Sequence, residues 1–417
     1  MGIREMKDSG IEWIGEIPKD WTVLPIKYVF NINRGRVISV LHLVENGKYP
    51  VYSSQTENDG CFGYLNTYDF EGPAITWTTD GAKAGSVFYR DGRYNCTNVC
   101  GILQLKESYN DVNLYFATYA IAVVAQQNKR YDINGFKIMS NEMARIKFAI
   151  PNIVEQQQIA DYLDTKCSEI DATAEDIQKE ISLLEDYKKS VITEAVTKGL
   201  NPDAEMKDSG VKWIGEIPVN WQAVNPRWLF AQRKDRAKKG MEQYTASQKY
   251  GVISQKDYMN RIGGSIVTVQ KDFDILKMVC EGDFVIHMRS FQGGLEYSEH
   301  TGSISSAYVM LIPQKNTGEC RYFKWLFKSA SYINALQSTS NLIRDGQAMR
   351  YSNFIQIIIP YPPLDEQQQI ADFLDTKCSE IDAIIADKKR QRGILAEYKK
   401  SLIYEYVTGK KEVPINE

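Results

Sequence analysis

The stretch EQQQIADYLDTKCSEIDA, residues 155–172, recurs as EQQQIADFLDTKCSEIDA at residues 366–383, with 17 of 18 positions identical. A second pair stands upstream: MKDSGIEWIGEIPKDW, residues 6–21, returns as MKDSGVKWIGEIPVNW, residues 206–221, with 12 of 16 identical. The segments between the blocks, 22–150 and 222–360, share length but little sequence. The pattern predicts an internal duplication, in which a repeated pair of blocks forms a common scaffold for two diverged globular units.

Each downstream block is expected to begin a long helix. Core-type positions recur in alternating steps of four and three from Leu163 to Ala195, and the same register runs from Leu374 to Leu402. This is a heptad repeat, and a stripe of this kind needs a partner helix. We expect the two helices to pair antiparallel over roughly 65 Å. The contact should be less regular where residues 388–393 interrupt the second stripe.

The predicted fold class is α+β: two globular mixed α/β domains separated by an antiparallel coiled coil and related by a pseudo-twofold internal repeat. We place the first domain at residues 1–150, the first helix at 151–205, the second domain at 206–361, the second helix at 362–412 and a tail at 413–417. The tryptophans of the repeated blocks should pack the domains against the helices, because they are copied while the domains diverge: Trp13, Trp21, Trp213 and Trp221. Cys167 and Cys378 lie on the heptad stripe and are expected to be core residues.

Composition sets broad limits on function. Apolar residues make up 43% of the 417 residues and charged residues 25%, which are ordinary globular values. The N-terminus has no apolar core of a secretory signal, and no apolar run is long enough for a membrane helix, so we expect a cytoplasmic protein. Seven cysteines without a Cys-x-x-Cys pair and three scattered histidines argue against a metal site and for reduced thiols.

The overall charge hides an uneven distribution. The net charge is −3 and the pI about 5.9, which is not typical of a uniformly basic nucleic-acid binder. However, residues 155–198 hold 11 acidic and 5 basic side chains, whereas residues 199–364 hold 20 basic and 15 acidic ones. The acidity therefore lies on the helices and the second globular unit is basic, so the total charge is only a weak argument against nucleic-acid binding.

The repeated blocks resemble the specificity subunit of type I restriction–modification enzymes. The carrying motifs are Lys-Asp-Ser-Gly-Ile-Glu-Trp-Ile-Gly-Glu-Ile-Pro-x-x-Trp, residues 7–21 and, with two changes, 207–221, and Pro-x-x-x-Glu-Gln-x-x-Ile-Ala-x-x-Leu-Asp, residues 151–164 and 362–375. The resemblance covers the whole chain in the expected order. It implies that each diverged unit is a target recognition domain for one half of a split, asymmetric site in double-stranded DNA, with the helices as spacer.

The resemblance also implies partners. Two methyltransferase subunits that bind S-adenosylmethionine would dock on the helices and methylate adenine, and restriction subunits would add ATP- and Mg-dependent cleavage. This chain would have no catalysis of its own, hence no catalytic residue. Independently, the closest string to an amino-methyltransferase motif, residues 225–228, lacks its second proline, and no phosphate-binding loop is present. Two alternatives stay open: a self-contained methylase or nuclease, and a coiled-coil scaffold that does not read DNA.

Candidate DNA contacts follow from the chemistry of cations for phosphates and of Arg, Gln, Asn and hydroxyls for base edges. In the second unit they form a basic run and three polar segments: Arg227, Arg233, Lys234, Arg236, Lys238 and Lys239; Arg289, Ser290 and Gln292; Ser305, Ser306 and Tyr308; Asn341, Arg344 and Gln347.

The first unit has weaker candidates of the same residue types, and an ordinary surface position is an equally good interpretation of each. They are Arg34 and Arg36; Ser53, Ser54 and Gln55; Thr78, Thr79 and Lys83; Lys129, Arg130, Asn134 and Lys137. The segment 129–137 is the strongest of these candidates, because it is equivalent to the segment around Arg344 in the second unit. Gly135 and Gly346 are separated by 211 residues, which is the offset of the repeat.

Overall fold

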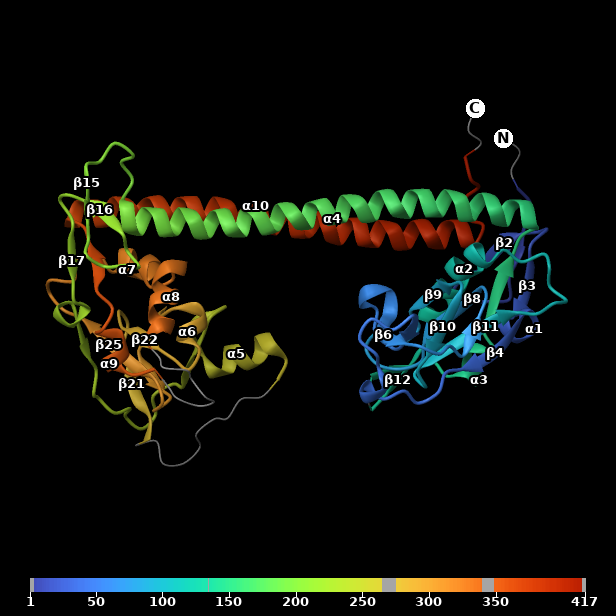
Figure 1. Cartoon of the computed structure of the whole chain (residues 1–417), viewed down its shortest axis with the longest axis horizontal. Helices are drawn as coiled ribbons and strands as arrows, with labels where there is room; N and C mark the ends of the chain where they lie inside the picture. The colour runs from blue at the N-terminus through green and yellow to red at the C-terminus, as the bar shows by residue number, and fades with distance from the viewer. Residues whose placement is uncertain (1–3, 134, 265–274, 340–348, 415–417) are drawn as a thin grey trace. The chain divides into compact units, whose positions relative to one another are not determined.

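The computed structural model describes residues 4–133, 135–264, 275–339 and 349–414 (Figure 1). The chain divides into two compact units, residues 1–177 with 390–417, and residues 178–389. Each unit holds one globular domain with one part of each long helix, α4 (Ile153–Lys198) and α10 (Leu364–Val407). Within each unit, the half-helices pack on the globular domain beside them. No described helix is long and apolar enough to cross a bilayer.

The first domain is built around two four-stranded sheets, ordered β4-β11-β8-β9 and β6-β5-β10-β7. Its elements are β1 (Met6–Asp8), β2 (Glu16–Pro18), β3 (Thr22–Pro25), α1 (Ile26–Val29), β4 (Phe30–Arg34), η1 (Val40–His42), β5 (Tyr49–Tyr52), η2 (Glu57–Gly60), β6 (Cys61–Leu65), β7 (Phe70–Glu71), β8 (Ala74–Thr78), β9 (Val87–Arg90), β10 (Arg93–Cys96), β11 (Cys100–Leu105), α2 (Leu114–Asn128), β12 (Arg130–Asp132), β13 (Gly135–Lys137), α3 (Ser140–Met143) and β14 (Lys147–Ile150).

A close approach of backbone and ring fixes the middle of the first sheet. Gly101 on β11 pairs with Trp77 on β8, and a Cβ at residue 101 would lie 2.2 Å from the indole ring. Trp77 is fully buried, and its Nε1 donates to the carbonyl oxygen of Ile138 at 3.0 Å. The glycine is therefore needed for packing, as is usual inside strands where another group comes close.

The second domain repeats the central sheet in the order β18-β25-β22-β23. Its elements are β15 (Met206–Asp208), β16 (Glu216–Pro218), β17 (Gln222–Val224), η3 (Pro226–Trp228), β18 (Phe230–Gln232), β19 (Tyr244–Ser247), β20 (Gly251–Ser254), α5 (Gln255–Ile262), β21 (Lys277–Val279), β22 (Phe284–Ile286), α6 (Ser290–Gly293), β23 (Glu296–Tyr297), β24 (Gly302–Ile304), β25 (Val309–Pro313), α7 (Cys320–Leu326), α8 (Ala330–Ser338), α9 (Tyr351–Phe354) and β26 (Ile359–Tyr361).

The two central sheets share one register, although their sequences differ. Phe30 pairs with Leu105 in the first sheet, and Phe230 pairs with Pro313 in the second. Gly101 lies opposite Trp77, and in the same place Val309 lies opposite Ile286. Backbone pairing therefore aligns three central strands of the two domains residue by residue, although these segments share little sequence.

In the first unit, the start of α4 packs against the end of α10. The rings of Tyr162 and Tyr406 lie 4.7 Å apart, and Lys399 bonds Asp171 at 2.6 Å. A later residue of α4 contacts an earlier residue of α10, so the two helices are antiparallel in this unit. The amide of Glu155 donates to Asn152 Oδ1 at 3.0 Å and caps α4.

In the second unit, the remaining halves of α4 and α10 also run antiparallel. Lys388 bonds Glu180 at 2.5 Å and Lys188 bonds Asp382 at 2.6 Å. Most of the predicted heptad positions are buried or half-buried, and Arg392, which is exposed, is an exception. Gly393 lies inside the continuous α10, and a Cβ there would meet nothing within 4 Å. The stripe is thus interrupted at the exposed Arg392, as expected, while the helix itself continues.

The repeated tryptophans join each domain to a helix, as the sequence predicts. Trp21 and Trp221 are both fully buried. The indole Nε1 of Trp21 donates to Glu155 at 3.1 Å, and that of Trp221 donates to Glu366 at 2.7 Å. Because the tryptophan and the glutamate belong to different repeated blocks, this bond explains why both blocks are copied together.

Candidate nucleic-acid interface

Strand ends and a turn meet at one edge of the first domain's central sheet. β4 and β8 end at this edge and β11 begins there, because the strands alternate in direction. The amide of Gly35 donates to the carbonyl oxygen of Cys100 at 3.1 Å, and that of Thr79 to Val99 at 3.0 Å. We call this the first loop edge and define it by residues 34–36, 53–55, 78–83 and 97–99.

The predicted cations of the first loop edge are exposed, but two of the three are held. The Nε of Arg34 donates to the carbonyl oxygen of Asn98, and the Nε of Arg36 donates to Asp69 at 2.8 Å. Lys83 is exposed, and within the described part of the chain its amine has no partner. Of the three, Lys83 is therefore the most available to a phosphate.

Several predicted polar residues of this edge face inward. Thr78 and Thr79 are buried, and the hydroxyl of Thr78 donates to the carbonyl oxygen of Lys83 at 2.6 Å. Ser53 accepts from the Thr97 hydroxyl at 2.9 Å. The remaining pair is half-buried, Ser54 and Gln55, and the Gln55 amide donates to the carbonyl oxygen of Cys61. Thr78 and Thr79 therefore shape the turn, and their predicted contact with bases is at odds with this burial.

The first loop edge also presents a residue that sequence reasoning missed. Asn98 is exposed in the turn between β10 and β11, and its side-chain amide has no partner among the residues that the structure describes. An Asn amide can pair bidentately with the edge of adenine. The available signal was the dipeptide Thr97-Asn98, which is typical of a turn between strands.

The ribbon formed by β12 and β13 adjoins the first loop edge. The amide of Ile138 donates to Thr79 at 2.9 Å, and Lys137 forms a bridge with Asp80. Ion pairs hold the predicted cations here: Arg130 to Glu142 at 2.6 Å and Lys137 to Asp132 at 3.0 Å, and Lys129 donates to Gln126 at 2.7 Å. The bond from Lys137 lowers the pKa of Asp132 below its usual value.

The second domain has an equivalent second loop edge, which we define by residues 233–239, 287–294 and 305–308. By the shared register, Lys234 takes the place of Arg34, and Ser306 takes that of Asn98. Segments that the sequence reasoning singled out separately thus meet at one edge, because β18 and β22 end where β25 begins.

The basic run of the second edge divides into internal and free cations. Arg233 makes two bonds to Asp283, at 2.7 and 2.8 Å, and the Asp283 side chain is only 2% exposed. Arg236 donates to Ile275 at 3.1 Å. The exposed cations without a partner in the described ranges are three lysines: Lys234, Lys238 and Lys239. Arg233 therefore stabilises the domain, and its guanidinium is less available to a phosphate than the three lysines are. Arg227 lies over the Trp228 ring.

The loop 288–294 presents two free side chains on a fixed backbone. Arg289 and Gln292 are exposed, and neither side chain has a partner among the described residues. Three side chains from elsewhere in the domain hold the carbonyl oxygens of residues 289, 291 and 293, at 3.1, 2.6 and 3.0 Å respectively: Gln248, Gln337 and Lys328. Ser290 is buried and accepts from the amide of His287 at 2.9 Å, so it supports the loop and does not face solvent.

The loop 305–308 closes the second edge. Ser306 is exposed, and Ser305 accepts from the amide of Ala307 at 3.3 Å. The carbonyl oxygen of Tyr308 accepts from Lys277 at 2.6 Å, and burial together with the nearby charge of Arg236 lowers the pKa of this lysine. Four predicted contacts lie outside the described residues: Asn134, Asn341, Arg344 and Gln347.

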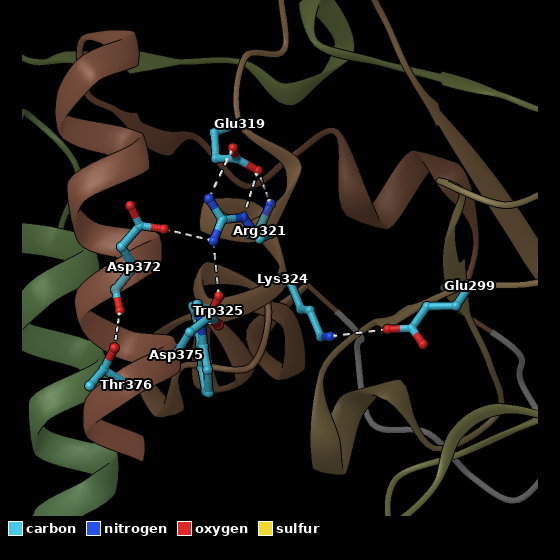
Figure 2. A network of polar contacts seen from close by, with 8 residues as sticks. All are labelled: Glu299, Glu319, Arg321, Lys324, Trp325, Asp372, Asp375 and Thr376. Carbon is cyan, nitrogen blue, oxygen red and sulfur yellow. Dashed lines mark hydrogen bonds and ion pairs between the residues drawn. The ribbon is translucent and has the colours of Figure 1, made fainter. Parts of the chain in front are cut away.

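Figure 2 shows how the second domain is fixed to its helix. Arg321 on α7 bonds Asp372 at 2.7 Å and Asp375 at 3.2 Å on α10, and Trp325 Nε1 donates to Asp375 at 2.8 Å. In the first unit, the hydroxyl of Tyr119 bonds Asp164 at 2.7 Å. Asp164 and Asp375 occupy the same position of the repeated block. Each loop edge is therefore carried by a domain that is anchored at an equivalent aspartate.

The lysines, the guanidinium and the amide of the second loop edge that lack a partner among the described residues suit phosphates and base edges. The described residues contain no group of three His, Cys, Asp or Glu side chains that could hold a metal ion.

Comparison with known proteins identifies the family. The family model described as type I restriction modification DNA specificity domain matches residues 18–183 and 218–391. A Mycoplasma pneumoniae protein named as a type I specificity subunit is 35% identical over 357 residues, which cover 84% of this chain and 87% of that protein. Another, named as an N-terminus, is 43% identical over 141 residues, or 34% of this chain and 74% of that protein.

Five further Mycoplasma pneumoniae relatives are matched over 41% to 57% of their own length. The fold is similar to a chain from a structural study of complex assembly and conformational transition of the type I restriction–modification system. The TM-score is 0.67 at 12% identity, over 95% of this chain and 99% of that one. Two matches of the family model, in domains of one register, show that this chain belongs to the DNA specificity subunits of type I restriction–modification systems, which are non-catalytic.

Proposed function

We propose that each loop edge reads one half of a split DNA sequence and that the two halves differ. The observation that carries this proposal is that equivalent positions on equivalent sheets hold different side chains. Arg34 stands where Lys234 stands, and Asn98 where Ser306 stands. Because an Asn amide favours adenine and a hydroxyl is less selective, the two edges favour different bases. An asymmetric target follows.

In the second half-site, we assign phosphate contact to the free lysines and base contact to the loop 288–294. Lys234, Lys238 and Lys239 have no partner among the described residues, and such cations supply affinity without sequence preference. Arg289 suits the two acceptors of guanine, and Gln292 suits adenine. The bonded backbone beneath them fixes the positions from which both side chains project before DNA arrives, which favours specificity.

We further propose that α4 and α10 form an antiparallel coiled-coil spacer with pseudo-twofold symmetry, on which two methyltransferase subunits dock. In the second unit, Leu183 is 69% and Tyr187 51% exposed on α4. Their repeat equivalents on α10 in the first unit, Ile394 and Tyr398, are 61% and 55% exposed. One such apolar pair in each copy suits two copies of one partner.

The chemistry of the assembly would belong to these partners. S-adenosylmethionine would bind to the methyltransferase subunits, and ATP and Mg to restriction subunits, in the cytoplasm.

The test is to coexpress this chain with its methyltransferase partner and to map every methylated adenine in the host genome. A motif of two short, different halves across a fixed gap is the expected result. Exchanging residues 222–360 for those of a related subunit should change one half only. If an assembled complex adds no sequence-specific methylation, the proposed recognition of DNA sequence is wrong. The result would then favour the alternative of a coiled-coil scaffold that does not read DNA.

Docking is tested separately by native mass spectrometry of the coexpressed complex. Tyr187→Glu and Tyr398→Glu should each lower the number of bound methyltransferase subunits from two to one, because each places a charge in one apolar contact. Lys189→Glu changes the charge of an exposed neighbour and is the matched control. Two bound subunits in both tyrosine variants would contradict the docking surface.

A further inference from the structure

The ribbon β12–β13 of the first domain carries two strongly exposed apolar side chains. Ile133, the residue after β12, is 95% exposed, and Tyr131 on β12 is 77% exposed. Single exposed apolar residues are common on protein surfaces. These two differ because they project from a ribbon that adjoins the first loop edge of a DNA-reading domain.

The ribbon is held firmly in place. Arg130 bonds Glu142 at 2.6 Å, and Lys137 bonds Asp132 at 3.0 Å across the two strands. The ring of Phe136 meets that of Tyr131 edge-on, with centroids 5.6 Å apart. These contacts fix β12 up to Asp132, the residue before Ile133, so less conformational entropy is lost when Ile133 enters a binding site.

The backbone ties the ribbon to the sheet that builds the loop edge. The amide of Ile138 donates to Thr79 at 2.9 Å, and the carbonyl oxygen of Ile138 accepts from the buried Trp77. On the neighbouring turn, Lys83 is exposed with no partner among the described residues, which places a free cation for phosphate beside the ribbon. DNA that contacts the first loop edge therefore lies within reach of Ile133.

We infer that Ile133, backed by Tyr131, inserts as an apolar wedge between neighbouring base pairs of the first half-site and kinks the duplex. Small and medium apolar side chains that enter base steps unstack them and bend DNA by about 20–90°. Insertion removes the isoleucine from water, and the cation of Lys83 holds the backbone of the opened step. This inference rests on the proposed reading function and adds a deformation of DNA to it.

The experiment uses the full chain in complex with its methyltransferase partner and a duplex that carries the mapped methylation motif. The base analogue 2-aminopurine replaces one base at a time in the first half-site, and its fluorescence rises where a step is unstacked. Dyes at the duplex ends report bending by energy transfer. We expect one step to brighten and the ends to approach in the wild-type complex.

Ile133→Ala should abolish the fluorescence rise, reduce the bend and weaken binding by about tenfold or more. Because Ile133 is exposed, the variant should fold normally, which its thermal unfolding checks. Val154→Ala, at a 64% exposed position of α4 in the same unit, is the matched control and should behave as wild type. Tyr131→Ala should act in the same direction as Ile133→Ala.

Two results would overturn the wedge. In the first, Ile133→Ala leaves fluorescence and bending unchanged. In the second, replacing thymine by uracil in the half-site reproduces the loss of binding, which would assign Ile133 to contact with a thymine methyl group. A wild-type complex without sequence-specific binding would instead refute the reading function and the wedge with it.

Discussion

Arg233 and Lys234 are neighbours in one basic run, yet alanine at each position is expected to affect different properties. Arg233 is 13% exposed and shares two hydrogen bonds with Asp283, which is 2% exposed. Removing the guanidinium leaves a buried carboxylate whose remaining donor among the described residues is the amide of Cys280 at 2.8 Å. Breaking a buried pair from one side costs about 3–5 kcal/mol, so Arg233→Ala should lower the stability of the second unit by about 3 kcal/mol.

Lys234→Ala should leave stability within about 0.5 kcal/mol, because the side chain is exposed and unpaired in the described ranges. It should instead reduce the salt dependence of DNA binding. Each phosphate contact contributes about −0.9 to the slope of log K against log salt, and that contribution should be lost. In Arg233→Ala the slope should stay unchanged once the folded fraction is corrected for.

The assays are denaturant unfolding of each variant and fluorescence anisotropy of a motif duplex over a salt series, both on the methyltransferase complex. Asp283→Ala should destabilise as Arg233→Ala does, and the double variant should cost less than the two together. Equal salt slopes for Arg233→Ala and Lys234→Ala would refute the division into internal and phosphate-binding cations. A stability loss below about 1 kcal/mol in Arg233→Ala would refute the buried pair.

Further expectations follow from the same contacts. Arg289→Ala should relax one base position of the second half-site by about 1–3 kcal/mol of discrimination, seen as extra methylated sequences, while the first half stays unchanged; relaxation of the first half would contradict the assignment. Arg321→Ala should destabilise by no more than about 1 kcal/mol in thermal unfolding, because the ion pairs are largely exposed; a much larger loss would mean that the anchor is essential to folding. Gly101→Ala should cost about 3 kcal/mol in chemical unfolding, since the methyl group overlaps Trp77; wild-type stability would mean that the indole can move freely.

The internal repeats and the helical periodicity predicted the scaffold of the protein correctly. The duplicated blocks predicted two domains on a common scaffold, and the heptad stripe predicted which positions of α4 and α10 are largely buried. The copied Trp21 and Trp221 predicted the domain–helix junctions, which the bonds to Glu155 and Glu366 confirm. These features are readable from sequence because they depend on local spacing and on identity between copies.

The candidate contacts were readable only as residue types. Arg233 and Lys234 have the same appearance in a basic run, and only Asp283, fifty residues away, distinguishes them. Thr78 and Ser290 look like polar loop residues, but both are buried. Asn98 went unnoticed because nothing local marks it as the free amide of a sheet edge.

The sequence by itself determined the family, the duplicated scaffold and the helical stripes, because helix periodicity and repeated motifs are local properties of the chain. Only the tertiary structure decided which polar residues meet at the two loop edges and which face inward. Strand register sets those neighbours, and register depends on pairing between residues far apart in the chain, such as Arg34 with Gly101 and Ile286 with Val309.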